Sequence, residues 1–391
     1  MGLTSGVFGW LMVAVAAGSL AAVVWAWPRV ARRRLPYLAA RLVMVAVSQL
    51  LVTAAFLVWL NGYFSFYDSW SQLLGTSQPA QAVSARHAAA GPAKQLVVDG
   101  SRPGPLPDAG RPAPLAAPPG GLPRPGPPSS PAVSGRLMQI AITGQRTGLS
   151  SGPGYVYLPP QYFQPAYRHT RFPVVLALTG YPGVAGGIVT RLELPSVAAS
   201  LLAARQIRPT VFVMLSVSPL FPYDTECTDI PAGPQVESFF AQDVTRAVEH
   251  AFRVTASPAG WGVVGYSTGG FCATKLAMMY PTRFSAAVSM AGYYQAYGGR
   301  FPRDLWGGSV AYRHENSPAW RLRHLPAPPV SVLVTSSRTG ERSLPGTLAF
   351  LHEIRPPMRG YSLIIPQGGH NFRTWNRELA PSLEWLSRHL S

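Results

Sequence analysis

The pentapeptide Gly265-Tyr266-Ser267-Thr268-Gly269 decides the fold of this chain of 391 residues. It lies between an apolar run, Trp261–Val264, and a helix-like run, Phe271–Tyr280, so it predicts a sharp turn from a strand into a helix. Small residues two positions on either side of the serine prevent collisions in such a turn. The turn holds the hydroxyl of the serine above the sheet, and the next N–H and the positive helix end point to where an oxyanion forms. The pattern therefore predicts a nucleophilic serine.

Apolar runs alternate with helical segments over most of the remaining chain. The predicted strands are 137–143, 154–158, 172–179, 211–217, 261–264, 285–291, 330–335 and 361–365. The predicted helices are 188–204, 236–252, 271–280, 344–353 and 375–390. This alternation predicts an α/β fold with a doubly wound, mostly parallel sheet, in which ligands bind at the carboxyl ends of the strands. Ser267, Gly180 and His370 each follow a predicted strand, so we expect all three at that one edge.

The serine requires a neighbouring base, because its hydroxyl is a poor nucleophile until its proton is removed. In hydrolases with this turn, the chain order is serine, acid, histidine. Gly368-Gly369-His370 directly follows the last predicted strand, and its two glycines let the loop turn back over the serine. We expect His370 to be the base.

The acid that orients the imidazole has to come from the segment between Ser267 and His370. That segment contains four carboxylates, which are Asp304, Glu315, Glu341 and Glu353. Glu341 lies in the loop after the strand 330–335, which is the usual position of the acid. Glu353 lies near the end of a helix, where a solvated carboxylate is the more ordinary interpretation. We therefore favour Glu341, and Glu353 stays open as the alternative.

Two backbone amides are candidates for the oxyanion hole. One is the N–H of Thr268, and the other comes from the loop Thr179-Gly180-Tyr181-Pro182 after the central strand. Tyr181 is the candidate there, because Pro182 has no N–H to donate. Donors of this kind contribute about 3–4 kcal/mol each in the transition state. No spacing typical of metal ligands occurs, and the predicted chemistry requires no cofactor.

The N-terminal segment contains two long uncharged apolar stretches, of 21 residues at Val7–Trp27 and of 19 residues at Leu42–Leu60. A hydrocarbon core is crossed by a helix of about 20 apolar residues. Arginines between them, at positions 29, 32, 33 and 34, favour the cytoplasmic side, so everything after Leu60 would face outward. A cleaved signal peptide would begin with positive charge, and Met1–Gly6 has no charged side chain. We therefore predict a transmembrane hairpin over residues 1–74.

A proline-rich segment follows the predicted hairpin. Ser101–Pro131 contains Pro-Gly-Pro, Ala-Pro-Pro-Gly-Gly and Pro-Arg-Pro-Gly-Pro-Pro. Such a composition cannot bury enough apolar surface to fold. We expect a disordered linker over 75–134 that tethers a catalytic domain at 135–391, and the alternative is a proline-rich recognition motif.

The composition bounds the surroundings of the chain. It has 33 basic and 16 acidic residues, a formal net charge of +17, and only two lysines, Lys94 and Lys275. No basic run is interleaved with stacking aromatic residues, so nucleic acid is not an expected partner. A positive body suits anionic lipid head groups or wall polymers.

Two further sets of residues have alternative interpretations. Cys227 and Cys272 form a possible disulfide if they lie outside the cell; otherwise Cys272 is a small packing residue and Cys227 is free. Tyr293, Tyr294, Tyr297 and Trp306 are candidates for the lining of an acyl pocket. Ordinary aromatic packing is the alternative for these four.

Three motifs carry a resemblance to a known family: Leu-Thr-Gly-Tyr181, Gly-Tyr-Ser267-Thr-Gly-Gly and Gly-Gly-His370-Asn-Phe-Arg-Thr-Trp375. On these, the chain over about 134–391 resembles the putative esterase family of α/β-hydrolases, which includes esterase D-like enzymes and the secreted mycolyltransferases of actinobacteria. The resemblance implies Ser267 as nucleophile, His370 as base and Thr268 as oxyanion donor. Some members have the acid just after the strand, like Glu341, and mycolyltransferases have it on the next helix, like Glu353. The hairpin departs from the secreted enzymes and resembles membrane-tethered actinobacterial relatives.

These observations predict an outward-facing, membrane-anchored serine esterase or acyltransferase. Its acyl-enzyme would be resolved by water or by an alcohol such as a sugar or glycerol, and its substrate would be a small-molecule or lipid ester. A serine peptidase of the same fold is the nearest alternative. A non-catalytic hydrolase-fold module that binds an envelope partner is an alternative of a different class.

Overall fold

The computed structural model describes residues 6–31, 34–64, 70, 96–99, 131–299 and 301–391. The chain divides into two compact units, Met1–Ser77 and Gln78–Ser391. The first unit contains the predicted hairpin, and the second contains the predicted linker and catalytic domain.

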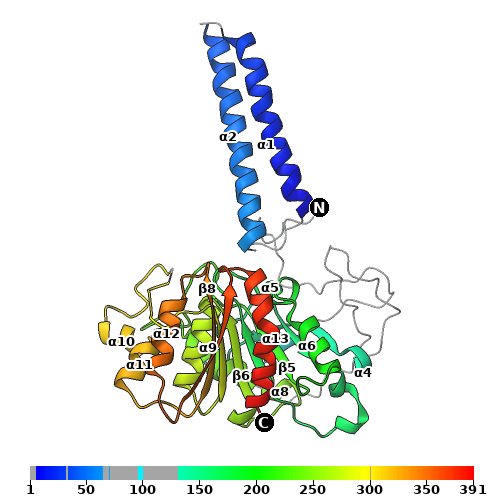
Figure 1. Cartoon of the computed structure of the whole chain (residues 1–391), viewed down its shortest axis with the longest axis vertical. Coiled ribbons are helices and arrows are strands. Elements are labelled where there is room, and N and C mark those ends of the chain that lie inside the picture. The colour runs from blue at the N-terminus through cyan, green and yellow to red at the C-terminus, as the bar shows by residue number, and fades with distance from the viewer. Residues whose placement is uncertain (1–5, 32–33, 65–69, 71–95, 100–130, 300) are drawn as a thin grey trace. The chain divides into compact units, whose positions relative to one another are not determined.

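The first unit is formed by two long helices, α1 (Gly6–Ala26) and α2 (Leu35–Phe64), which lie side by side (Figure 1). A short turn of helix, η1 (Trp27–Val30), follows α1. The segments Gly6–Val30 and Leu35–Asn61 are long and apolar enough to cross a membrane. The second helix begins earlier than the predicted apolar span 42–60, because Pro36 is tolerated in the first turn and Arg41 within the helix.

The second unit is built on one nine-stranded sheet with the order β1-β2-β3-β5-β4-β6-β7-β8-β9. The strands are β1 (Leu96–Asp99), β2 (Arg136–Thr143), β3 (Gly154–Leu158), β4 (Val174–Leu178), β5 (Val211–Leu215), β6 (Trp261–Tyr266), β7 (Ala286–Met290), β8 (Ser331–Thr339) and β9 (Arg359–Gln367). Strand β3 is antiparallel to β2 and to β5, and all other pairs are parallel. The predicted α/β fold with a mostly parallel sheet is therefore confirmed.

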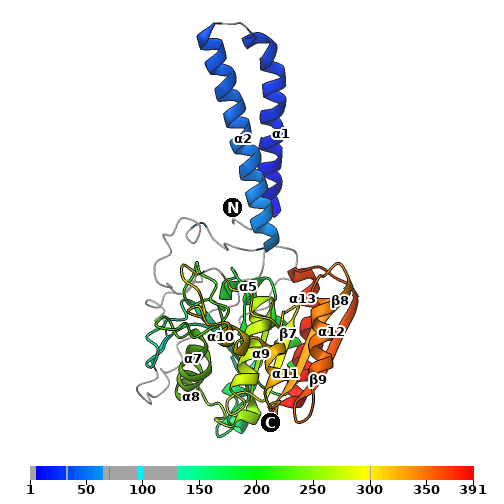
Figure 2. The ribbon, with the colours of Figure 1, turned by 90° about the vertical axis from the view of Figure 1, so that its left-hand side faces the viewer.

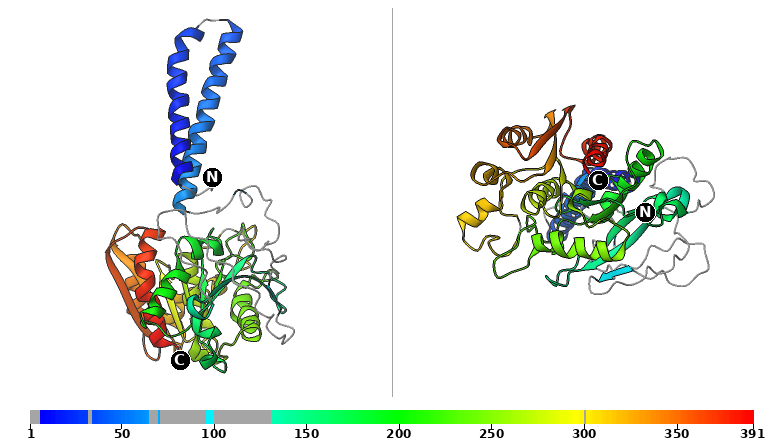
Figure 3. Two further views of the ribbon diagram at one scale, coloured as in Figure 1. Left: turned by 90° about the vertical axis from the view of Figure 1, so that its right-hand side faces the viewer. Right: turned by 90° about the horizontal axis from the view of Figure 1, so that it is seen from below.

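Helices cover both faces of this sheet. The longer ones are α6 (Leu194–Ala203), α8 (Thr245–Ala251), α9 (Thr268–Met279), α11 (Pro318–His324), α12 (Leu344–Glu353) and α13 (Phe372–His389), and α5 (Ala185–Thr190) is shorter. The shorter ones are α4 (Pro131–Ser134), η2 (Pro160–Phe163), η3 (Pro165–Tyr167), α7 (Val236–Ser238), the π-helical η4 (Phe239–Val244), η5 (Pro258–Gly260) and α10 (Val310–Glu315). Viewed from below, α13 and α8 lie on opposite sides of the strands (Figure 3).

The two hydrophobic cores follow the alternation of side chains along the strands. In β4, Val174, Leu176 and Leu178 belong to one core, with side chains of α8, α9, α11 and α12. Val175 and Ala177 belong to the other core, with side chains of α5, α6 and α13. Since successive side chains of a strand point to opposite faces, a strand buried on both faces is a continuous apolar run, as the sequence of β4 is. Figure 2 views the face with α9, α11 and α12.

The segment predicted as a disordered linker, 75–134, lies mostly outside the described residues. Two pieces of it are described, β1 and α4, and they are regular structure. Strand β1 pairs in parallel with β2, with Leu96 opposite Ile140. The prediction of a linker without regular structure over its whole length is therefore wrong at Leu96-Val97-Val98. This short apolar run adds an edge strand to the sheet.

Several predicted bounds differ from the structure. The predicted helix 188–204 is two helices, α5 and α6, because Glu193 between them is left-handed (φ 54°) and Pro195 lies in the first turn of α6. Strands β8 and β9 are longer than predicted and remain paired as far as Thr339 and Gln367. The extension is polar, so apolar patterning alone did not indicate it.

Candidate active site

The turn at Ser267 has the predicted strand-to-helix geometry. It joins β6 to α9 directly, and Ser267 has a left-handed backbone with φ 56° and ψ −123°. Such a conformation is strained for a residue other than glycine and is common at functional sites. A side chain on Gly265 would overlap the backbone of Gly269, and one on Gly269 would overlap the carbonyl of Thr179. Both glycines of the motif are therefore required by close backbone approach.

The structure brings Ser267, His370 and Glu341 together. The Nε2 atom of His370 is 2.8 Å from the Oγ atom of Ser267, and its Nδ1 atom is 3.3 Å from Oε1 of Glu341. The side chain of His370 is 48% exposed and that of Glu341 is 1% exposed. A buried carboxylate, an accessible imidazole and a serine hydroxyl are thus aligned in the order required for base-assisted nucleophilic attack.

Close packing of two loops makes the contact between Glu341 and His370. Gly340 has φ +89°, and a side chain there would overlap the carbonyl of Gly368. The N–H of Gly368 donates to the carbonyl of Thr339 over 3.0 Å, and the hydroxyl of Ser337 donates to the carbonyl of Gly368 over 3.0 Å. These contacts continue the β8–β9 pairing, so the carboxylate and the imidazole that follow the two strands meet.

The alternative acid, Glu353, is the last residue of α12. It lines a cavity together with Arg323 and Phe350 and has no contact with His370 among the described residues. Its residue type and distance in the sequence suited the role, but its position in the fold does not.

The two candidate oxyanion donors both lie at the turn. Thr268 is the first residue of α9, and the first N–H groups of a helix have no acceptor within it. The loop after β4 reaches the same place: a side-chain carbon on Gly180 would be 2.9 Å from Cβ of Ser267. Tyr181 follows Gly180, and its hydroxyl donates to the carbonyl of Pro222 over 2.6 Å, which fixes the loop.

The sequence motifs do not indicate one further buried glutamate, Glu378. Glu378 on α13 is fully buried and accepts a hydrogen bond of 2.6 Å from the hydroxyl of Thr335. Burial, together with the charge of Glu341, raises the pKa of Glu378 to about 8, against smaller opposing effects of Thr335 and Arg377. Its burial could have been predicted from its position along the helix. Glu378 lies on the same face of α13 as the apolar residues Trp375, Leu379 and Leu383.

Cys227 and Cys272 form a disulfide that joins the loop before η4 to the helix that follows Ser267. One helical turn further along α9, Lys275 is fully buried and makes a salt bridge of 3.1 Å with Glu237. Its Nζ atom also donates to the carbonyl of Cys227 over 2.8 Å. The 224–229 loop is therefore fixed to α9 by a covalent bond and by a buried cation.

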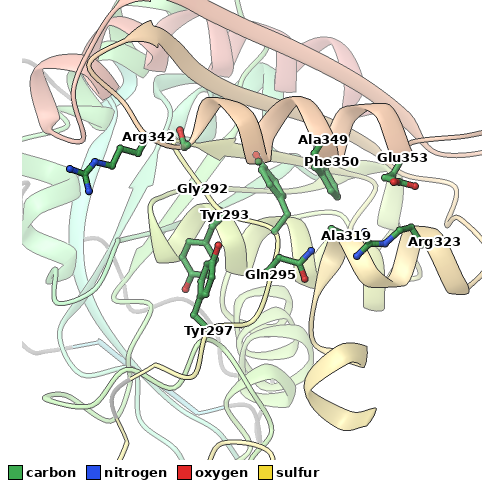
Figure 4. A pocket seen from close by; sticks show the side chains of 13 residues that line it. Gly292, Tyr293, Gln295, Tyr297, Ala319, Arg323, Arg342, Ala349, Phe350 and Glu353 are labelled. Atoms are coloured by element: carbon green, nitrogen blue, oxygen red, sulfur yellow. The ribbon is translucent and has the colours of Figure 1, made fainter. Parts of the chain in front are cut away.

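A cavity of about 230 Å³ lies beside the candidate site, between α11, α12 and the loop after β7 (Figure 4). Tyr293, Tyr294 and Tyr297 line it, as do Arg342 and Ser343, which follow Glu341. Trp306 does not line it and packs against Phe271 and Leu305. Of the four aromatic residues considered for a pocket lining, three are in a lining and one is in a core. No group of three or more metal-ligating side chains occurs within the described residues.

The comparisons with known proteins agree with this geometry. The family described as "Putative esterase" matches residues 151–386. An uncharacterised protein of Corynebacterium glutamicum is 22% identical over 268 residues, which cover 65% of this chain and 62% of that protein. The match thus spans less than two thirds of the length of this relative.

Solved structures with the same fold include three serine hydrolases or esterases. A ferulic acid esterase has a TM-score of 0.55 at 18% identity, over 66% of this chain and 99% of its own. An S-formylglutathione hydrolase from Agrobacterium tumefaciens has a TM-score of 0.55 at 16% identity, over 66% and 97%. A fluorophosphonate-binding serine hydrolase of Staphylococcus aureus has a TM-score of 0.52 at 15% identity, over 65% and 98%.

The fold is that of the α/β-hydrolases. Because the family match covers more than half of the chain, this protein belongs to the putative esterase family. The predicted class of enzyme, a carboxylic ester hydrolase, is thereby confirmed.

Proposed function

We propose that this protein is a membrane-anchored serine esterase or acyltransferase with Ser267 as nucleophile, His370 as general base and Glu341 as the orienting acid. The observation that carries the proposal is the pair of contacts on the imidazole of His370, 2.8 Å to Ser267 Oγ and 3.3 Å to Glu341 Oε1. The family membership supports the class of reaction, and these contacts support the proposed roles of the three residues.

In the proposed mechanism, Ser267 Oγ attacks the carbonyl carbon of the ester while His370 Nε2 takes the hydroxyl proton. Glu341 accepts a hydrogen bond from His370 Nδ1 and stabilises the imidazolium. The oxyanion accepts hydrogen bonds from the N–H groups of Thr268 and Tyr181. When the intermediate collapses, the alcohol leaves with the proton from Nε2, and the acyl group stays on Ser267.

The second half of the reaction reverses these roles. Water or an alcohol gives its proton to His370 Nε2 as it attacks the acyl-enzyme, and Ser267 leaves with that proton. Water yields the free acid, and an alcohol such as glycerol or a sugar yields a new ester. The sequence resemblance to mycolyltransferases motivates the transfer branch, and the family membership motivates the hydrolytic one.

The catalytic proposal is tested with the full chain in detergent micelles. Wild type should release p-nitrophenol from p-nitrophenyl acetate and should be labelled by a fluorophosphonate probe. Ser267→Ala should do neither, because the attacking oxygen is removed. If the two proteins release p-nitrophenol at equal rates, or if wild type is not labelled, Ser267 is not the nucleophile. Added glycerol that lowers the yield of free acid, with a glyceryl ester formed instead, would identify a transferase.

We further propose that α1 and α2 cross a membrane and that the catalytic unit is extracytoplasmic. The length and apolarity of the two helices support the anchoring, and the arginines between the helices support a cytoplasmic connection. The disulfide of Cys227 with Cys272 supports an oxidising compartment independently. In intact spheroplasts, added protease should digest the C-terminal unit. Digestion only after the membrane is broken would reverse the orientation.

A further inference from the structure

Glu226 is a buried carboxylate that the proposed mechanism does not use. It is 2% exposed, yet both of its oxygens accept hydrogen bonds from one short segment. Oε1 accepts from the hydroxyl of Tyr293 over 3.1 Å and from the N–H of Tyr297 over 3.2 Å. Oε2 accepts from the N–H of Tyr297 over 3.1 Å and from that of Gly298 over 3.0 Å. A single side chain therefore fixes the course of the loop after β7.

Glu226 is itself held in place from behind. It and Cys227 are left-handed residues, with φ of 45° and 52°, and Cys227 is bonded to Cys272 on α9. Lys275 donates to the carbonyl of Cys227 over 2.8 Å and to the hydroxyl of Thr228 over 3.2 Å. The carboxylate thus projects from a rigid support rather than from a free loop.

The segment that Glu226 holds connects the candidate site to the cavity. The ring of Tyr293 stacks on Phe271 of α9, with centroids 4.6 Å apart and planes at 13°. Burial and the charges of Glu226 and Asp224 raise the pKa of Tyr293, and the side chain of Thr268, next to Ser267, opposes them. Tyr293 and Tyr297 lie together at the lining of the cavity, with ring centroids 5.3 Å apart (Figure 4).

The rest of the lining combines apolar residues, among them Ala319, Ala349 and Phe350, with polar and charged ones. Arg323 and Glu353 lie together at one end, Gln295 lies between the ends, and Arg342 lies at the other end with its side chain extending outward (Figure 4). Within the described residues, neither Arg323 nor Arg342 has an ion pair or hydrogen bond. Sites for drug-sized ligands have about 300–1,000 Å³, so this cavity of about 230 Å³ suits a smaller group. A hydrocarbon chain would desolvate the charged groups without replacing their hydrogen bonds, which is unfavourable.

We propose that this cavity is the subsite for a short acyl group that ends in a hydrogen-bond acceptor, such as a carboxylate, and that Glu226 is a positioning residue that fixes its tyrosine wall. The inference rests on the proposed acyl-enzyme at Ser267. Arg342 supplies donors for the acceptor, and the hydroxyls of Tyr293 and Tyr297 supply further polar contacts. Glu226 acts through the two tyrosines and does not touch the substrate.

The test uses the full chain in micelles and three esters of p-nitrophenol. The hemisuccinate and the butyrate have four-carbon acyl groups that differ in the terminal carboxylate, and the dodecanoate has a long chain. Wild type should have the highest kcat/KM for the hemisuccinate and the lowest for the dodecanoate. A preference for the dodecanoate would overturn the assignment of the subsite.

Glu226→Gln tests the positioning role. Its amide presents N–H groups where backbone N–H groups already point, so the tyrosine loop should shift. We expect the KM for the hemisuccinate to rise about tenfold and kcat to change by less than about threefold, with fluorophosphonate labelling retained. Asp229→Asn is the matched control, because Asp229 is a carboxylate of the same loop that accepts hydrogen bonds from Ser238. Equal increases in KM in the two variants would mean that Glu226 has only a structural role.

Arg342→Ala tests the subsite without a buried substitution. It should lower the preference for hemisuccinate over butyrate about threefold, a small effect because Arg342 is exposed. Arg338→Ala is its control, since Arg338 is also exposed and does not line the cavity. An unchanged preference in Arg342→Ala would contradict the proposal. Loss of labelling in wild type is a different result, because it would refute the nucleophile as well.

Discussion

At the scale of single residues, two glutamates could not be separated by their positions in the sequence. Both Glu341 and Glu353 lie between strands β8 and β9, and resemblance to known enzymes supported each. The contact of Glu341 with His370 depends on the Gly340–Gly368 packing, which involves residues from two strands. Ser267 and His370 were different, because nearby glycines, on both sides of Ser267 and before His370, mark the tight turns that position them.

This difference predicts the outcome of two substitutions. Glu341→Gln should lower kcat for p-nitrophenyl acetate by about a hundredfold or more, because a neutral amide does not stabilise the imidazolium. Glu353→Gln should leave kcat within about twofold of wild type. The measurement is the steady-state rate of p-nitrophenol release. For each variant, this rate is divided by the amount of protein that a fluorophosphonate probe labels. The reverse order of the two effects would assign the acid to α12.

Glu378 predicts a dependence of stability on pH. Below the ordinary glutamate pKa of 4.5, the folded and unfolded states are both protonated at this position. Above it, the unfolded state loses a proton that the folded state keeps until about pH 8, so the free energy of unfolding decreases over this interval. Above about pH 8 both states are ionised, and the loss is complete.

Thermal melts of the full chain at a series of pH values check this. The Tm of wild type should fall between about pH 5 and pH 8, and that of Glu378→Gln should fall less, since the amide is neutral and can still accept from Thr335. Glu384→Gln is the control, because Glu384 is on the same helix and pairs at the surface with Arg388. Parallel curves for wild type and Glu378→Gln would mean that Glu378 is ionised in the folded protein at neutral pH.

At the scale of elements, apolar patterning predicted the buried strands and missed what lies beyond them. The central strand β4 and the helix α12 agree closely with the predicted bounds, since both have clear apolar periodicity. The last four residues of β8 are polar, and the last two residues of β8 and of β9 are exposed, so only pairing defines them. Helices α10 and α11 were not predicted, because they are short and lie outside the alternating pattern.

The two loops that follow β8 and β9 pack closely at Gly340 and Gly368, so even one added methyl group should have an effect. Gly340→Ala should lower the free energy of unfolding by about 1–3 kcal/mol, because its φ is +89° and the methyl group would overlap the backbone of Gly368. It should also lower kcat, since the Glu341–His370 contact depends on this packing. Thermal unfolding and p-nitrophenyl acetate turnover measure the two effects.

Gly346→Ala is the matched control, because Gly346 is in α12 with open space at its Cβ position. Alanine there should increase stability by up to about 1 kcal/mol through helix propensity. Equal losses in the two variants would show that the β8–β9 junction is not specifically sensitive.

At the scale of the whole molecule, composition separated the apolar N-terminal unit from the rest, and the predicted boundary at residue 74 lies close to the structural one at Ser77. Composition could not reveal that residues within the predicted linker, 75–134, add a strand to the sheet, because strand pairing is a property of the folded sheet. The parallel sheet itself followed from the alternation of strands and helices.

The apolar unit predicts the behaviour of the chain in membranes. The full chain should remain in the membrane pellet after an alkaline carbonate wash, and a variant that lacks residues 1–74 should be released to the supernatant. Fluorophosphonate labelling of both fractions verifies that the proteins are folded. Release of the full chain by carbonate would mean that α1 and α2 do not cross the bilayer.

The burial of Lys275 has a practical consequence for detecting the covalent intermediate. Activated esters acylate exposed lysine amines without catalysis, and this background commonly obscures an acyl-serine in intact-mass spectra. The chain has two lysines, of which Lys94 lies outside the described residues and Lys275 is 0% exposed. The part of the chain that the structure describes therefore presents no lysine amine to solvent. Added acyl mass on tryptic peptides of the catalytic unit should report Ser267 against very little chemical background.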